Sequence, residues 1–124
     1  MRVLALDYGS ARCGCAVSDP TGTLATPIAP VERPATRKGL ARLAALVRER
    51  EIGRVVVGLP LGLSGEDTAQ TAETRAFAAR LADALGPAVP VELYDERFTT
   101  RIAARVGGRA SEDSRAAAVL LEGW

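Results

Sequence analysis

The sequence predicts an α/β fold, a five-stranded mixed sheet in the order 3-2-1-4-5 with helices on both faces. Short apolar runs with the character of strands alternate with stretches of helical periodicity. The first three runs are separated only by turn signals, which indicates an antiparallel meander. A helix precedes each of the last two runs, which indicates crossovers to strands parallel to the first. At 124 residues, we expect a single domain over 1–124.

The N-terminal meander is predicted at 3–7, 13–18 and 23–28. The first run is apolar and ends in a carboxylate at Asp7, and the second consists of small residues. The third strand is predicted to be weaker, because prolines occur at 27, 30 and 34.

The rest of the chain alternates helices and strands. One amphipathic helix is predicted between Thr36 and Arg50, and a second that ends at Gly86. They are indicated by apolar residues at helical spacing: Leu40, Leu43, Ala44 and Val47 in the first, Phe77, Leu81 and Leu85 in the second. The continuous apolar run at 54–58 is typical of a central strand buried on both faces, and 91–94 is predicted as the fifth strand. Two further helices are predicted after Thr99 and Ser111, which can cap them.

Composition limits the chemistry that is open to this chain. There is no histidine, which excludes triads and general bases that depend on imidazole. Cys13 and Cys15 are too close in one strand for an unstrained bridge and have no third soft ligand, so we predict reduced thiols that pack in the sheet. Any hydrolysis must therefore depend on carboxylates and a metal ion.

The charge and hydropathy of the chain argue against a polycation that binds nucleic acid by bulk charge, a membrane-spanning protein and a secreted protein. A net charge of +1 is too small to hold nucleic acid by bulk charge alone. Every basic residue except Lys38 is arginine, which suits bidentate phosphate contacts but also fits a bias in base composition. No apolar run approaches the roughly 20 residues of a membrane span, and Asp7 interrupts the N-terminal run too early for a signal peptide. We therefore expect a cytoplasmic protein.

Acidic residues are predicted to meet at one edge of the sheet. The C-terminal ends of parallel strands share an edge, which brings Asp7 to the pair Asp95-Glu96. Asp113, in the first turn of the last predicted helix, can add a third carboxylate. Hard oxygen ligands of this kind suit Mg²⁺ or Mn²⁺ and phosphate substrates. Each acid alone also has an ordinary structural role, as a helix N-terminal charge or a polar strand end.

Four ordered blocks carry a resemblance over nearly the whole chain: Leu6–Gly14 with Ala16–Asp19, Val57–Leu61 with Gly65, Asp95–Thr100, and Asp113-Ser114 with Ala116–Leu121. They resemble the YqgF/RuvX family of RNase H-like nucleases, related in fold to Holliday junction resolvases. The resemblance implies a metal-dependent nuclease that uses Mg²⁺ or Mn²⁺ and processes the 5′ end of precursor 16S ribosomal RNA. A resolvase-like DNA endonuclease is the first alternative, and a catalytically inactive RNA- or transcription-associated module is the second.

The resemblance also assigns roles to particular residues. The family's catalytic and metal-binding acids fall on Asp7, Glu96 and Asp113, with Asp95 less favoured as a ligand. Arg12 would contact phosphate, unless it is an ordinary exposed turn residue. Arg97 and Arg101 lie four apart on one face of a predicted helix, followed by Arg105, and either contact nucleic acid or form a solvated face.

The expected partner is nucleic acid, either structured RNA or branched DNA, bound by a monomer or a homodimer. Two departures from the family pattern concern substrate affinity: Gly62 replaces an expected asparagine, and the segment before Asp113 is short and lacks a basic run. A phosphotransferase of the actin and hexokinase type is a rival, because Asp7–Ser10 resembles its first phosphate loop. Such enzymes clamp a nucleotide between two domains, and this chain has the length of one.

Overall fold

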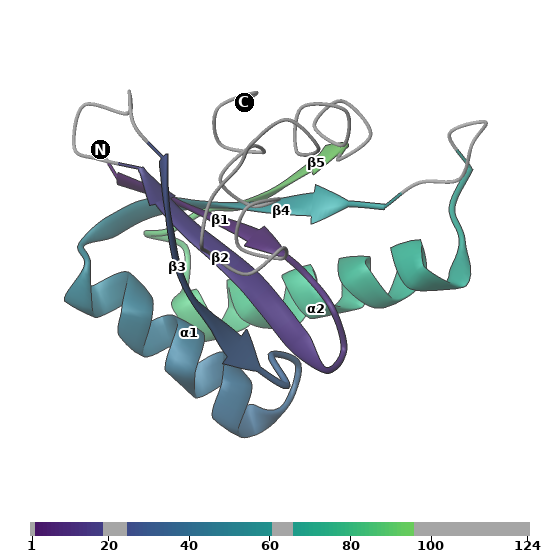
Figure 1. Cartoon of the computed structure of the whole chain (residues 1–124), viewed down its shortest axis with the longest axis horizontal. Coiled ribbons are helices and arrows are strands. Elements are labelled where there is room, and N and C mark those ends of the chain that lie inside the picture. Colours follow the sequence, from purple (N-terminus) through teal and green to yellow (C-terminus); the bar gives the residue numbers. More distant parts are fainter. Residues whose placement is uncertain (1, 19–24, 61–65, 96–124) are drawn as a thin grey trace.

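A computed structural model describes residues 2–18, 25–60 and 66–95 of the chain. The elements in chain order are β1 (Arg2–Asp7), β2 (Arg12–Ser18), β3 (Ala25–Glu32), α1 (Arg37–Glu49), β4 (Ile52–Leu59), α2 (Ala69–Leu85) and β5 (Val91–Asp95). They form one five-stranded sheet in the order β3-β2-β1-β4-β5 (Figure 1). β2 pairs antiparallel with β1 and β3, whereas β4 pairs parallel with β1 and β5. The predicted strand order and mixed pairing are confirmed.

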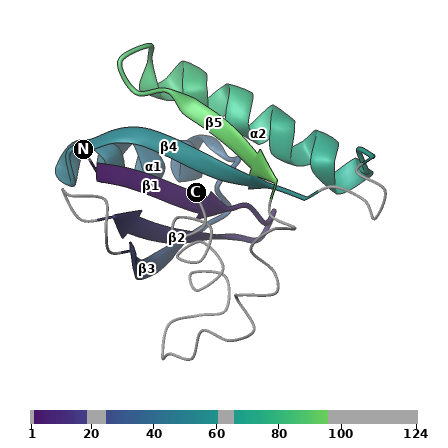
Figure 2. The same ribbon diagram turned by 90° about the horizontal axis from the view of Figure 1, so that it is seen from above.

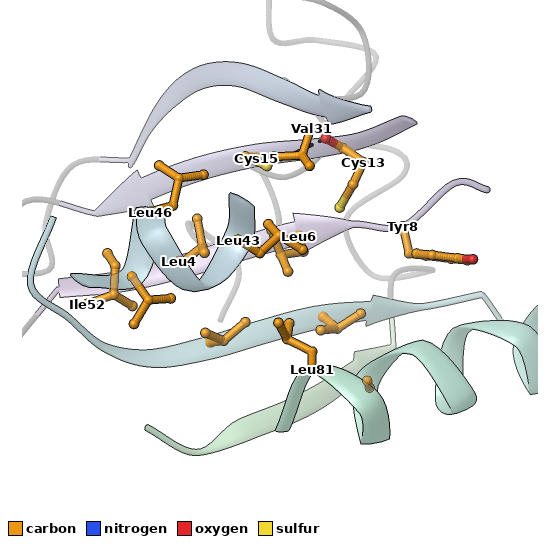
Figure 3. Packing of buried hydrophobic residues seen from close by; sticks show 14 of the residues in the cluster. Leu4, Leu6, Tyr8, Cys13, Cys15, Val31, Leu43, Leu46, Ile52 and Leu81 are labelled. Atoms are coloured by element: carbon orange, nitrogen blue, oxygen red, sulfur yellow. Dashed lines mark hydrogen bonds between the residues drawn. The ribbon is translucent and has the colours of Figure 1, made fainter. Parts of the chain in front are cut away.

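The main core lies between the sheet and the two helices. α1 and α2 both pack on one side of the sheet, which we call the helix face (Figures 1 and 2). Leu4 and Leu6 of β1 meet Leu43 of α1 and Leu81 of α2 in this core (Figure 3). All four side chains are fully buried, and for Leu43 and Leu81 this agrees with the predicted helical spacing.

A smaller apolar cluster marks the other side of the sheet, which we call the second face. It consists of Val3, Ala5, Ala16 and Val56. We predicted helices on both faces, and the two described helices share one. The helix predicted after Ser111 lies outside the described residues. Neither described helix is long and apolar enough to cross a membrane.

β4 occupies the position that its continuous apolar run predicted. It lies between β1 and β5, and its residues Val55, Val56 and Val57 have no exposed surface. Val55 and Val57 belong to the core on the helix face, and Val56 belongs to the cluster on the second face. Neighbours on both sides and apolar contacts on both faces explain why this strand carries no alternation of polar and apolar residues.

β3 is longer than predicted, because it extends to Glu32 instead of ending at Ile28. It is an edge strand, and the pairing with β2 is irregular between Cys13 and Cys15, where Ile28 and Val31 are the successive partners. Pro30 falls within this irregularity. A bulge on an edge strand tolerates a residue without an N–H, so the proline does not end the strand.

The helices begin and end close to the predicted residues. The Thr36 side chain caps α1 by accepting a hydrogen bond from the Gly39 amide at 3.1 Å. Thr68 and Thr71 form a reciprocal capping box at the start of α2. α2 ends at Gly86, whose φ of 81° lies in the region that favours glycine.

Candidate active site

Asp7 lies where the three parallel strands β1, β4 and β5 end. We call this side of the sheet, formed by their C-terminal ends, the site edge. Leu6 of β1 pairs with Val57 of β4, and Val57 in turn pairs with Leu93 of β5. β1 ends at Asp7, the residue after Leu6. β5 continues to Asp95, which pairs with Leu59 of β4. The backbone register therefore brings the ends of β1 and β5 to one edge, as predicted. β4 lies between them, so their axes are roughly 10 Å apart at about 4.8 Å per strand.

The strand period assigns Asp7 to the second face. Ala5 and Val3 lie two and four residues before it and belong to the cluster on that face. Tyr94 of β5 packs against the same cluster. The Asp7 side chain is half-buried. A carboxylate in this place can interact with a ligand that approaches the sheet from the second face.

Arg12 lies at the same edge, because β2 begins where β1 turns back. It is exposed, and it is the first residue of β2. Asp7 pairs with Gly14, and Arg12 lies two residues from that glycine, so alternation assigns Arg12 to the second face as well. The structure thus brings Asp7 and Arg12, two of the predicted site residues, to one edge and one face.

The turn between β1 and β2 requires a glycine at position 9. A Cβ atom on Gly9 would lie 2.6 Å from the carbonyl oxygen of Arg12, closer than real Cβ contacts. The amide of Arg33, just beyond β3, donates a 2.9 Å hydrogen bond to the carbonyl oxygen of Ala11 and ties this turn to the edge strand. The turn is therefore a compact support for Asp7 on one side and Arg12 on the other.

Tyr8 follows Asp7 and its side chain lies on the opposite face, in the core (Figure 3). Its ring stacks on Phe77 of α2 with centroids 4.5 Å apart, and its hydroxyl donates a 3.0 Å hydrogen bond to Oε1 of Glu73. Burial, with the hydrogen bond and the charge of Glu73 acting in the same direction, raises the pKa of Tyr8 to about 12. In the sequence Tyr8 stands within the Asp7–Ser10 motif, whereas nothing there marks Glu73 as part of the site.

The end of β4 is also attached to α2. The Thr71 hydroxyl donates a hydrogen bond to the carbonyl oxygen of Pro60, and Thr71 is fully buried. The strand predicted at 54–58 extends one residue further, to Leu59. Gly58 and Leu59 are buried and pair with Tyr94 and Asp95 of β5.

The remaining predicted site residues lie outside the described part of the chain: Glu96, Arg97, Arg101, Arg105 and Asp113. Among the residues that the structure does describe, no group of three or more acids or cysteines is arranged to hold a metal ion. Cys13 and Cys15 are not joined in a disulfide and are buried in the core on the helix face (Figure 3). The prediction of reduced, packing cysteines is confirmed, and these thiols lie on the opposite face from Asp7.

A groove of about 500 Å³ lies between the two helices. It is lined by Arg37, Leu40, Ala41, Ala44, Arg48, Arg80 and Ala84. Both helices cover the helix face, whereas Asp7 belongs to the second face, so this groove is not part of the candidate active site.

Comparisons with known proteins agree on one family. A family model described as "RuvX: Holliday junction resolvase" matches residues 1–124. A protein of Anaeromyxobacter sp. (strain Fw109-5), named "Putative pre-16S rRNA nuclease", is 44% identical over 133 residues, covering 100% of this chain and 96% of the relative. A protein of Mycobacterium leprae (strain Br4923) with the same name is 45% identical, covering 99% of this chain and 71% of the relative.

The fold also has solved counterparts. Thermus thermophilus RuvC, in a complex with Holliday junction substrate, superposes with a TM-score of 0.63. The match covers 98% of this chain and 91% of that chain, at 14% identity. Likeness at this level of identity concerns the fold alone, and it confirms the RNase H-like architecture of the sheet.

Proposed function

Because this chain belongs to the RuvX family, we propose that it is a metal-dependent nuclease that hydrolyses phosphodiester bonds in precursor 16S ribosomal RNA. One observation carries the proposal: Asp7 lies on the second face of an RNase H-like sheet, at the edge where β1, β4 and β5 end together. The names of the two relatives support the ribosomal substrate. A substrate of that kind supports a cytoplasmic location.

We propose Asp7, Glu96 and Asp113 as the ligands of Mg²⁺ or Mn²⁺. Glu96 comes two residues after Tyr94, so a continued strand period would give it the face that Tyr94 and Asp7 share. The donor set fits hard divalent cations, because the chain has no histidine and both thiols are buried on the other face. When bound, such ions activate a water molecule and stabilise the charge on the phosphoryl oxygens.

We propose that arginines bind the phosphate backbone of the substrate. Arg12 supports this role, because it is exposed beside Asp7 on the second face and its guanidinium can make bidentate contacts. Arg97 and Arg101 are proposed to extend the contact, on the strength of their four-residue spacing alone. All three would position the substrate without taking part in chemistry.

A Holliday junction resolvase activity is the second candidate, favoured by the description of the family model. Resolution requires two cuts and hence two active sites, so this candidate requires a homodimer. A single cleavage near the 5′ end of a precursor RNA requires one site, which a monomer supplies. The two candidates therefore differ in oligomeric state as well as in substrate.

The deciding experiment is a Mn²⁺-dependent cleavage assay with two substrates, a precursor 16S rRNA fragment that includes the 5′ leader and a four-way DNA junction. Wild type is compared with Asp7→Asn, and sedimentation gives the oligomeric state. We expect cleavage of the RNA by the wild type only. Preferential cleavage of the junction by a dimer would establish the resolvase, and binding of RNA without cleavage would establish an inactive binding module.

A further inference from the structure

The chain directly after β1 is attached to α2 through a side chain, in addition to the strand pairing of β1. The proposed chemistry does not use this contact. β1 ends at Asp7, and the parallel pairing with β4 ends one residue earlier, at Leu6 and Val57. On the β2 side, Asp7 is the last residue of β1 in the antiparallel pairing, opposite Gly14. Two residues later the chain passes through Gly9 into the turn. The backbone that carries Asp7 is thus the last paired part of β1, directly before the turn.

Tyr8 supplies the attachment at this point. Successive residues of a strand point to opposite faces, so Tyr8 enters the core on the helix face while Asp7 belongs to the second face. The tyrosine is 7% exposed, its ring stacks on Phe77, and its hydroxyl donates to Glu73 at 3.0 Å. A hydrogen bond to a carboxylate is roughly twice as strong as one between neutral groups. It joins residues 65 positions apart.

The helix that receives Tyr8 is also anchored to the neighbouring strand. Thr71 donates to the carbonyl oxygen of Pro60, directly after β4, and Thr71 and Thr74 are fully buried. The Thr68 cap fixes the first turn of the same helix. The N-terminal half of α2 therefore holds the ends of both β1 and β4, with polar contacts at the site edge and apolar contacts further along.

We propose that Tyr8 and Glu73 are positioning residues, which fix the backbone of Asp7 so that its carboxylate meets a divalent cation in the correct place. The inference rests on the proposed metal-binding role of Asp7. Groups that hydrogen-bond directly to a metal ligand typically change metal affinity by about 10- to 100-fold when they are lost, and because Tyr8 acts through the backbone next to Asp7 we expect the lower end of that range. Neither side chain would touch the metal or the substrate, since both lie on the helix side of the sheet.

The alternative is that the pair stabilises the fold and has no influence on Asp7. Metal affinity separates the two, measured by titrating Mn²⁺ into the full chain in a calorimeter without nucleic acid. Tyr8→Phe and Glu73→Ala each remove the hydrogen bond, whereas Glu73→Gln keeps an oxygen that accepts it. Thr74→Val is the matched control, because it removes one buried hydroxyl bond, to the Gln70 carbonyl oxygen, from the same part of α2.

We expect Tyr8→Phe and Glu73→Ala to weaken Mn²⁺ binding by about tenfold each, and the double variant by no more than either. Glu73→Gln and Thr74→Val should bind within about twofold of wild type. Thermal melts would show whether each variant is folded at the temperature of the titration.

Two results would overturn the inference. Unchanged Mn²⁺ affinity in Tyr8→Phe and Glu73→Ala would show that the pair does not position Asp7, and so would an equal loss in Thr74→Val, which would reflect general destabilisation of α2. Both leave the proposed nuclease intact. If the wild type itself fails to bind Mn²⁺, the proposed metal site fails and the positioning role fails with it.

Discussion

Asp7 lies directly opposite Gly14 in the antiparallel pairing of β1 with β2. Residues that face each other in such a pair place their Cβ atoms about 5 Å apart, and glycine has none. The cross-strand neighbour therefore puts no side chain beside the carboxylate on the second face. Toward the turn, the next residue of β2 on the second face is Arg12. An acid and an exposed base therefore lie at the same edge, and Gly14 places no side chain between them.

The substitution Asp7→Asn keeps the shape of the side chain and removes the negative charge that a hard cation needs. We expect Mn²⁺-dependent cleavage to fall by more than about 100-fold. Clustered carboxylates repel one another without metal, so the melting temperature of the metal-free protein should stay equal or rise slightly. Cleavage and melting are measured on the same preparation. Full activity would remove Asp7 from the site, and inactivity with a large drop in melting temperature would indicate a structural role.

The raised pKa of Tyr8 predicts a loss of stability at alkaline pH. In the unfolded chain Tyr8 ionises near its ordinary value of 10.0, whereas in the folded protein it ionises near 12. Its contribution is therefore complete below pH 10 and is lost as the pH rises from 10 to 12. The loss amounts to up to about 2 kcal/mol in the free energy of unfolding.

Tyr8→Phe tests this pH dependence, because it has no phenol to ionise. Urea denaturation of the metal-free proteins at pH 9, 10 and 11 should show the wild type losing stability more steeply than the variant. Taking the difference between the two proteins cancels the ionisation of every group that they share. Parallel curves would show that Tyr8 ionises in the folded protein as it does in the unfolded chain.

Gly9→Ala tests the compact turn behind Asp7. The added methyl group would meet the Arg12 carbonyl oxygen at 2.6 Å, so the turn must shift. We expect a loss of about 1–3 kcal/mol in stability and a clear loss of Mn²⁺ affinity. Gly86→Ala is the control, because its φ of 81° strains an alanine but nothing lies within 4 Å of the new Cβ. It should lose about 1–3 kcal/mol and keep its Mn²⁺ affinity. Equal metal affinity in both variants would argue against a role for the turn.

The sheet order could be predicted from the sequence because each connection has a local cause. Apolar continuity marked 54–58 as central, and the right-handed crossover rule then left one order for the parallel strands. The length of β3 could not be predicted in the same way. Pro30 is acceptable only because the strand lies at an edge and is irregular opposite Cys13 and Cys15, and neither condition is visible in the local sequence.

The location of the site at one edge of the sheet could be predicted from the sequence. The residues that support Asp7 from the other face could not. Topology alone brings Asp7 to the same edge as Asp95, and the register confirms it. Glu73 gave no signal, because an exposed glutamate on an amphipathic helix is ordinary, and its contact with Tyr8 arises only when α2 packs on the sheet. Whether Glu96 and Asp113 complete the site stays a prediction.

The last prediction concerns the arginines, which should contribute affinity for nucleic acid and leave the chemical step unchanged. Each phosphate contact releases counterions, so replacing Arg12 with alanine should weaken RNA binding similarly for different sequences and reduce the salt slope of log K by about 1. Arg97→Ala and Arg101→Ala should do the same if their side chains reach the backbone. Lys38→Ala is the control, because Lys38 lies exposed on α1, on the other side of the sheet. Binding is measured between 50 and 200 mM salt with a metal-free protein, and single-turnover cleavage is measured with saturating enzyme and Mn²⁺. A slower single-turnover rate with intact binding would show that the arginine acts on the reacting phosphate. An unchanged salt slope would show that the arginine is a solvated surface residue that does not contact phosphate.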